Sequence, residues 1–165
     1  MNTRFKRITP FLWFDDQAEE AANYYVSIFD NSRIVTVNRY GKEGAKTTGK
    51  PEGSVMTVAF ELDGEQFSAI NGGPLFTFNP ALSLVVHCRN QHEVDHFWNH
   101  LSKDGDPSAQ ACGWLKDRYG LSWQIVPTQL IELLSHPDPA KAGKVMQAML
   151  GMKKIDIAAL ENAAA

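Results

Sequence analysis

An internal repeat of strand-like stretches limits the folds that this chain can adopt. Residues 113–127 read GWLKDRYGLSWQIVP, and residues 60–70 have a similar order of apolar and aromatic side chains around a turn glycine. The two stretches superpose when Gly64 is placed on Gly120. Runs of β-branched and aromatic residues bounded by Gly and Pro are typical of strands, so each stretch is predicted to be a β-hairpin.

Each hairpin is preceded by a strand and an amphipathic helix, and these openings also superpose on each other. The strand and helix are predicted at 7–14 and 17–29 in the first half, and at 82–88 and 91–103 in the second. The aspartates before the first helix and Asn90 before the second are predicted to cap them. With a further strand around 33–40 or 108–112, each half is predicted to be a βαβββ module. Such a repeated unit cannot bury its own sheet face and must pair with its copy.

The predicted fold is therefore α+β, with two paired βαβββ modules and an extra C-terminal helical segment. We expect a single domain over 1–165, with modules at 6–71 and 82–127. The helical tail over 128–165 is expected to pack across the sheet or against a second subunit. Residues 41–53 contain four glycines and are predicted to form a mobile loop, either a plain connection or a lid over a pocket.

Composition excludes several kinds of partner. A net charge of −3 and a pI near 5.9 argue against nucleic acid, whose binding proteins normally carry a basic patch. No apolar run approaches the roughly 20 residues needed to span a bilayer, so no membrane association is expected. The N-terminus has no h-region and no small-residue cleavage site, so we expect a cytoplasmic protein. Cys88 and Cys112 are then expected to be reduced core residues.

Four stretches carry a resemblance to a known family. They are TPFLWFDDQAEEAANYYVSIF (9–29), SVMTVAFELDGEQFSAINGGP (54–74), CGWLKDRYGLSWQIVP (112–127) and AMLGMKKIDIAALE (148–161). Together they resemble the PhnB-like branch of the vicinal oxygen chelate superfamily, often labelled 3-demethylubiquinone methyltransferase-like. That superfamily includes glyoxalase I, extradiol dioxygenases, and bleomycin- and fosfomycin-resistance proteins. The resemblance implies sheets that curl around a central cavity, and a homodimer.

In metal-dependent members of the superfamily, side chains from the first and last strands of each module bind a divalent ion. Carried over to this sequence, those positions fall at about Pro10, Ser68, Ser83 and Gln124. Proline has no ligating side-chain atom, and neutral hydroxyls are poor ligands for ions that prefer imidazole, carboxylate or thiolate. We therefore disfavour a divalent metal at these positions and expect no other cofactor.

Strand alternation then predicts a mostly apolar cavity with a few polar groups, which is the usual composition of a small-molecule site. The predicted cavity residues are Phe14, Gln66, Ser68, Asn71, Ser83, His87, Ser122 and Gln124. His87 is the candidate catalytic acid or base, the alternative being a hydrogen-bonded structural residue. Asn71 either meets the ligand or has a purely conformational role.

Other chemically active residues are assigned to packing or to solvent. His92, His96 and His100 recur every fourth residue, a spacing that can chelate a metal, but they lie beside the apolar stripe of their helix. We interpret them as a solvated face. The same strand alternation predicts that Trp13 and Trp123 face away from the cavity and pack between helix and sheet.

Three functions remain open at this stage. The sequence favours a small-molecule-binding protein of the resistance type, which needs a pocket and no metal. The alternative is a superfamily enzyme of the lyase, dioxygenase or isomerase type acting on a small oxygenated metabolite, with His87 and Gln124 in polar roles. A quinone methyltransferase ranks last, because no Gly-rich turn of the Rossmann kind follows Phe14 or Cys88.

Overall fold

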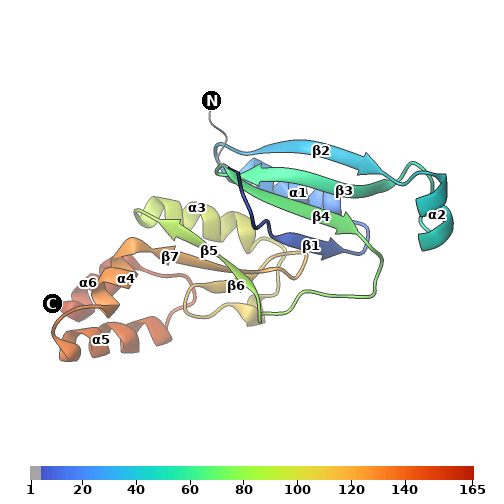
Figure 1. Cartoon of the computed structure of the whole chain (residues 1–165). Helices are drawn as coiled ribbons and strands as arrows, with labels where there is room; N and C mark the ends of the chain where they lie inside the picture. The colour runs from blue at the N-terminus through green and yellow to red at the C-terminus, as the bar shows by residue number, and fades with distance from the viewer. Residues whose placement is uncertain (1–4) are drawn as a thin grey trace. The chain divides into compact units, whose positions relative to one another are not determined.

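The computed structural model describes residues 5–165, and it divides into two compact units that each contain one sheet (Figure 1). The first unit runs to Thr77 and the second begins at Phe78. Both units combine strands with helices, so the predicted α+β class is confirmed. Among the described residues, no helix combines the length and apolar character needed to cross a membrane.

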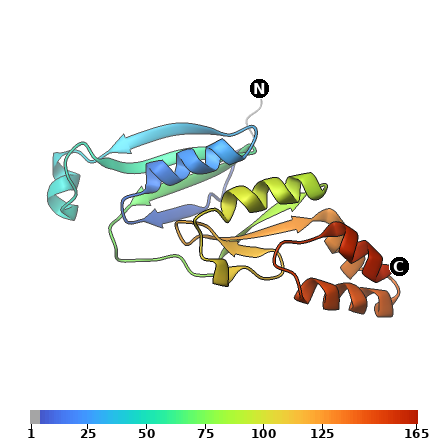
Figure 2. The same cartoon turned by 180° about the vertical axis from the view of Figure 1, so that it is seen from behind.

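The first unit is a four-stranded sheet with one long helix on it. Its elements are β1 (Phe11–Phe14), α1 (Ala18–Ile28), β2 (Arg33–Arg39), α2 (Lys42–Thr48), β3 (Val55–Leu62) and β4 (Glu65–Asn71). The strand order is β1-β4-β3-β2, with β1 parallel to β4 and the other pairs antiparallel. Helix α1 lies along one face of this sheet (Figure 2). Alanines on α1 allow the close approach, and Tyr25, Val58 and Phe60 are almost fully buried there.

The hairpin between β3 and β4 forms as the sequence predicts. Leu62 pairs with Glu65, so the loop contains only Asp63 and Gly64. Both loop residues have a positive φ, 46° and 77°, which is the left-handed conformation that a two-residue hairpin of type I′ requires. An Asp-Gly pair is well suited to this turn, because glycine tolerates the left-handed region and aspartate adopts it more readily than most residues.

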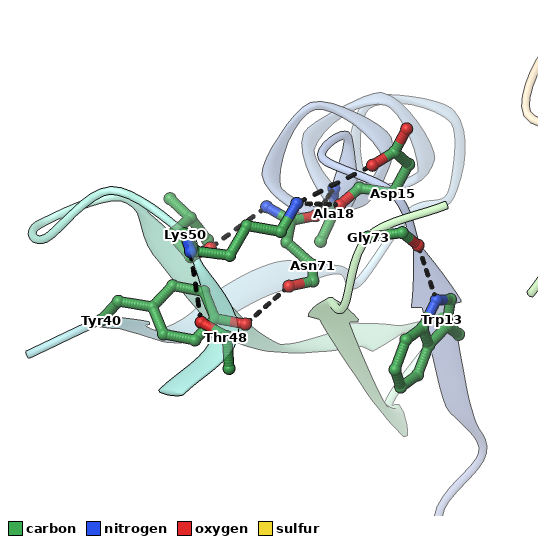
Figure 3. Close-up of polar contacts among 9 residues, drawn as sticks. Trp13, Asp15, Ala18, Tyr40, Thr48, Lys50, Asn71 and Gly73 are labelled. Atoms are coloured by element: carbon green, nitrogen blue, oxygen red, sulfur yellow. Dashed lines mark hydrogen bonds and ion pairs between the residues drawn. The ribbon is translucent and has the colours of Figure 1, made fainter. Parts of the chain in front are cut away.

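The N-terminus of α1 is capped from a distance, and the predicted aspartate cap is wrong. Gln17 occupies the N-cap position and its side chain makes no capping hydrogen bond. The backbone N–H of Ala18 instead donates to Oδ1 of Asn71 at 2.8 Å (Figure 3). Nδ2 of Asn71 donates to the carbonyl of Val55 at 3.2 Å, and the hydroxyl of Tyr40 donates to the Asn71 carbonyl at 2.7 Å. One buried residue thus joins β4, β3, α1 and the end of β2.

The predicted loop over 41–53 contains a helix, so the loop prediction is wrong for its central residues. Helix α2 occupies Lys42–Thr48 and begins after Gly41. It ends at Gly49, whose left-handed φ of 74° lets its N–H donate to the carbonyl of Ala45. The four glycines suggested a coil, but two of them mark the helix boundaries. Only Gly44 lies inside the helix, next to the ring of Tyr40.

The second unit has a three-stranded sheet and four α-helices within its described residues. Its elements are β5 (Ser83–Cys88), α3 (Gln91–Leu101), β6 (Trp114–Lys116), β7 (Ser122–Pro127), α4 (Thr128–Leu134), α5 (Pro139–Leu150) and α6 (Ile157–Ala164). The strand order is β5-β7-β6, with β5 parallel to β7 and β6 antiparallel to it. The predicted cap of α3 is present, because Oδ1 of Asn90 accepts from the backbone N–H of Glu93 at 3.0 Å.

The second unit lacks one predicted strand. Residues 107–109 form a short 3-10 turn, η1 (Pro107–Ala109), and the only strand-like pairing described between 108 and 112 is a single bridge from Ala111 to Trp114. Oδ1 of Asp106 accepts from the backbone N–H of Ser108, which stabilises the turn. Pro107 fixes its own φ and has no N–H for a sheet. The two modules therefore differ by one strand, although their sequences repeat.

The C-terminal tail has a small core of its own. The buried side chains of this cluster are Leu130, Val145, Ile155, Leu160 and Ala164. Backbone bonds attach the tail to the second unit, since Cys112 N–H donates to the carbonyl of Met152 and Gly113 N–H to that of Lys153, both at 2.8 Å. The side chain of Gln91 also donates to the Ile155 carbonyl and accepts from Ile157 N–H.

Replacing Asn71 with alanine should destabilise the protein, because it removes the cap of α1 and leaves the Val55 carbonyl without its partner. We expect the free energy of unfolding to fall by about 2 kcal/mol. Urea denaturation followed by circular dichroism measures the change. Asn99→Ala is the matched control, because Asn99 is exposed on α3. A loss below about 0.5 kcal/mol at Asn71 would show that the network contributes little.

Leu160→Ala tests the core of the tail. Leu160 has no exposed surface, so its truncation should lower the free energy of unfolding by about 3 kcal/mol. The same substitution at Leu150, which is 65% exposed, is the control and should cost far less. Equal effects of the two substitutions in urea denaturation would mean that the tail contributes no packed core.

Candidate functional site

The candidate site lies on the sheet face of the second unit that α3 does not cover. The register pairs Ser83 with Ser122, Val85 with Gln124, and His87 with Val126. Directly paired residues share a face, so these six side chains lie on one face of the sheet. The alternate residues, which include Val86, Cys88, Trp123 and Ile125, are buried on the opposite face. Strand alternation in the sequence predicts this division for β5 and β7.

Two of the predicted residues are in direct contact on this face. Nε2 of Gln124 donates to Oγ of Ser83 at 2.9 Å, so the last strand of the unit is joined to its first by side chains as well as by backbone. Both side chains are half-buried, whereas Ser122 is almost fully buried and His87 is exposed. The face therefore offers neutral hydrogen-bonding groups beside an exposed imidazole.

A hollow of about 290 Å³ lies next to this face, entirely within the second unit. Its lining residues are Pro80, Asp106, Ser108, Ala109, Trp114, Leu115, Lys116 and Ser122. The β6–β7 register places Trp114 opposite Gln124 and Lys116 opposite Ser122, so hollow and polar face adjoin. Sequence reasoning found Ser122 but missed Trp114 and Lys116. The turn glycine at Gly120 was a signal for them, because folding the chain back there brings Lys116 and Trp114 beside β7.

The Asp106 carboxylate belongs to the rim of this hollow and is held by Ser108. Its Oδ1 accepts from the backbone N–H of Ser108 at 2.9 Å and from the Ser108 hydroxyl at 2.7 Å. These bonds keep the pKa of Asp106 below its ordinary value, and the positive charge of Lys116 acts in the same direction. The carboxylate is therefore charged at neutral pH.

In the first unit, two predicted cavity residues lie on the wrong face. The parallel register pairs Phe11 with Ser68 and Phe14 with Asn71. The sequence predicts that Pro10 shares a face with Ser68, so the predicted faces of β1 are shifted by one residue. Phe14 and Asn71 are buried on the side that α1 covers, opposite to Ser68. Asn71 has the conformational role that the sequence left open, because its side chain binds Ala18 and Val55.

Trp13 occupies the position predicted for Phe14, and its own predicted orientation is wrong. It pairs with Ile70 and therefore shares the face of Gln66 and Ser68. Its indole Nε1 donates to the carbonyl of Gly73 at 2.9 Å (Figure 3). A Cβ on Gly72 would collide with the indole ring, so glycine at this position makes room for the tryptophan. Trp123 does pack on the helix side, where its indole donates to Asp117.

Lys50 ties the segment after α2 to the end of β1. Its Nζ donates to the carbonyl of Asp15 at 3.0 Å and lies 3.7 Å from the carboxylate Oδ1 of the same residue (Figure 3). The segment 41–53 is thus anchored at both ends, by Tyr40 and by Lys50. Whether it acts as a lid or as a plain connection stays a prediction.

The donor set at the four carried-over metal positions does not fit a divalent ion. Pro10 offers no side-chain donor, and Ser83 and Gln124 are neutral groups bound to each other. Within residues 5–165, no group of three or more His, Cys, Asp or Glu side chains is placed to hold a metal. On α3, the rings of His96 and His100 lie 4.4 Å apart, but His100 Nδ1 is within 2.7 Å of the His96 carbonyl.

The chain is similar to proteins of one family along most of its length. The family model for 3-demethylubiquinone-9 3-methyltransferase matches residues 6–126. A PhnB protein from Bacillus cereus is 38% identical, with 74% of this chain and 100% of that chain covered and a TM-score of 0.65. The protein PA1353 from Pseudomonas aeruginosa is 18% identical over 74% and 98%, with a TM-score of 0.58, and supports the fold alone.

The chain therefore belongs to the 3-demethylubiquinone-9 3-methyltransferase family and is similar to a PhnB protein, as its motifs predict. The matched residues end at Val126, so the helices α4 to α6 lie beyond the family model. No match was found among the curated proteins compared with the chain.

The two cysteines should differ strongly in reactivity. Burial, together with the charge of Glu93, raises the pKa of the Cys88 thiol to about 12, whereas Cys112 is half-buried. Because the thiolate is the reactive form, Cys88 stays protonated and unreactive up to about pH 9.

At pH 8 we expect iodoacetamide to label native Cys112 at least about 100-fold faster than Cys88. Peptide mass spectrometry measures both rates, and labelling in 6–8 M urea is the control, where the rates should converge. Similar rates in the native protein would contradict the burial of Cys88.

Proposed function

We propose that this chain is a cytoplasmic small-molecule-binding protein that binds its ligand without the usual divalent metal. The ligand lies on the face of the β5–β7 sheet that α3 does not cover, which we call the open face. The observation that supports the proposal is the Ser83–Gln124 pair on that face. A half-buried hydroxyl and amide, flanked by the apolar side chains of Val85 and Val126, resemble the lining of a ligand site: largely apolar, with a few oriented polar groups. The Gln124 amide still has a second N–H and a carbonyl oxygen with which to bind.

A homodimer is part of this proposal, as the family resemblance implies. Analytical ultracentrifugation of the full chain tests it directly. A monomer at all concentrations would contradict the dimer. The binding role of the open face would still be tested by Gln124→Ala.

The second candidate is an enzyme of the superfamily acting on a small oxygenated metabolite. The observation in its favour is His87, an exposed imidazole on the same face as Gln124. If His87 acts as the acid or base, His87→Gln should abolish turnover. A methyltransferase remains the last candidate, because the turns after β1 and β5 lack the glycines of a Rossmann phosphate loop. The family name describes an activity that we do not extend to this chain.

Gln124→Ala should weaken ligand binding at least about tenfold without unfolding the protein, because a directed amide contact is lost from a half-buried site. Native mass spectrometry of untagged protein, coupled to elemental analysis, shows whether a molecule or a metal co-purifies. If nothing co-purifies, a fragment screen by NMR supplies the probe. Gln147→Ala, at an exposed position on α5, is the matched control.

Two results would contradict the proposal. One is unchanged affinity of Gln124→Ala for a ligand that NMR places on the β5–β7 face. The other is stoichiometric metal that persists after His92, His96 and His100 are replaced by glutamine, since the bound metal would then have to sit elsewhere.

A further inference from the structure

The hollow beside the open face exists because the second unit lacks a strand. Where the first unit has β2, the second has the short turn η1 and a single bridge at Ala111. Residues of this turn and of β6 line a space of about 290 Å³. This volume is at the small end of ligand pockets, which span roughly 300–1,000 Å³. A small metabolite, rather than a drug-sized molecule, matches it.

The hollow carries two opposite charges that do not pair with each other. Asp106 and Lys116 both line it, and the charge of Lys116 acts on the Asp106 carboxylate. Within residues 5–165 the structure describes no ion pair between them, and Ser108 is the residue that holds the Asp106 carboxylate in place. A ligand with a single negative charge would meet the repulsion of Asp106, and one with a single positive charge the repulsion of Lys116.

The rest of the lining suits an apolar body with a polar end. Trp114 supplies aromatic surface, and Pro80 adds an apolar edge. The hydroxyl of Ser122 comes from a residue that is only 1% exposed, and it lies on the strand directly opposite Lys116. An indole ring also attracts an ammonium group or an aromatic ring across its face.

We propose that this hollow is a subsite for a small zwitterion with an apolar body, whose ammonium group faces Asp106 and whose carboxylate faces Lys116. Free amino acids and their close derivatives belong to this chemical class. The inference rests on the proposed function in one respect, since it takes the ligand of the open face to extend into the hollow. It adds the class of ligand, which the Ser83–Gln124 pair does not specify.

Three probes that share a phenylethyl group test the charge requirement. L-phenylalanine carries both charges, 2-phenylethylamine only the positive one, and 3-phenylpropanoate only the negative one. Each is titrated into the 15N-labelled full chain, and the shifts of the Trp114 indole N–H and the Ser122 amide are followed by NMR. We expect phenylalanine to bind about five- to tenfold more tightly than either analogue, because both charges then find a partner.

Asp106→Asn and Lys116→Gln should each remove this preference. Asparagine keeps the oxygen that accepts from Ser108, so the turn is retained. Glu132→Gln and Lys144→Gln, at exposed positions on α4 and α5, remove the same charges elsewhere and should change nothing.

Equal affinities for the three probes, shifts confined to residues outside the hollow, or no binding of any probe at about 10 mM would each overturn the subsite. The failures of the two proposals are distinguishable. If Gln124→Ala releases its ligand while the probes show no charge preference, the subsite is wrong and the binding function stands. If the probes show the preference while Gln124→Ala has no effect on a ligand of the open face, the hollow alone is the site.

Discussion

The side-chain amide of Asn71 is the interaction on which the first unit depends. Its oxygen caps α1 and its nitrogen donates to Val55, the first residue of β3, while the backbone carbonyl of Asn71 accepts from the Tyr40 hydroxyl. A buried amide is stable only when its donors and acceptors are satisfied, so these contacts stabilise one another. They hold the end of β4, and Gly72, the next residue, lies against the ring of Trp13. The cap on the α1 side of this sheet and the Trp13 side chain on its other side are thus held by consecutive residues, Asn71 and Gly72.

Features with local physical causes could be predicted from the sequence, and those with distant causes could not. The Asp63–Gly64 turn and the Asn90 cap depend on residues within a few positions, and both form as expected. The cap of α1 comes from 53 positions away, so no local pattern reports it. The phase of β1 depends on its backbone register with β4, and an error of one residue exchanges the two faces. For β5 and β7 the predicted phase is right, so Ser83, His87, Ser122 and Gln124 share a face.

The two modules repeat in sequence more closely than in structure, and the difference has a physical origin. In the second module, Pro107 and the Asp106 side chain favour a turn where the first module has β2. The backbone N–H groups of Cys112 and Gly113 then donate to carbonyls of the tail, so the tail satisfies donors beside the short strand β6. A segment beyond the family model is therefore part of the structural support of the second unit.

Recognition of a ligand at the open face can use hydrogen bonds and charge, and different residues supply the two. Ser83 and Gln124 are neutral, and each can donate or accept, so their pair orients a ligand but selects weakly by charge. Charge selection must come from ionised groups, and on this side of the second unit Asp106 and Lys116 line the neighbouring hollow. Because Asp106 is exposed and Lys116 is only half-buried, each charge contributes little alone, and the pair contributes mainly when one ligand engages both. Discrimination among small molecules therefore depends on the spacing of their charges more than on net charge.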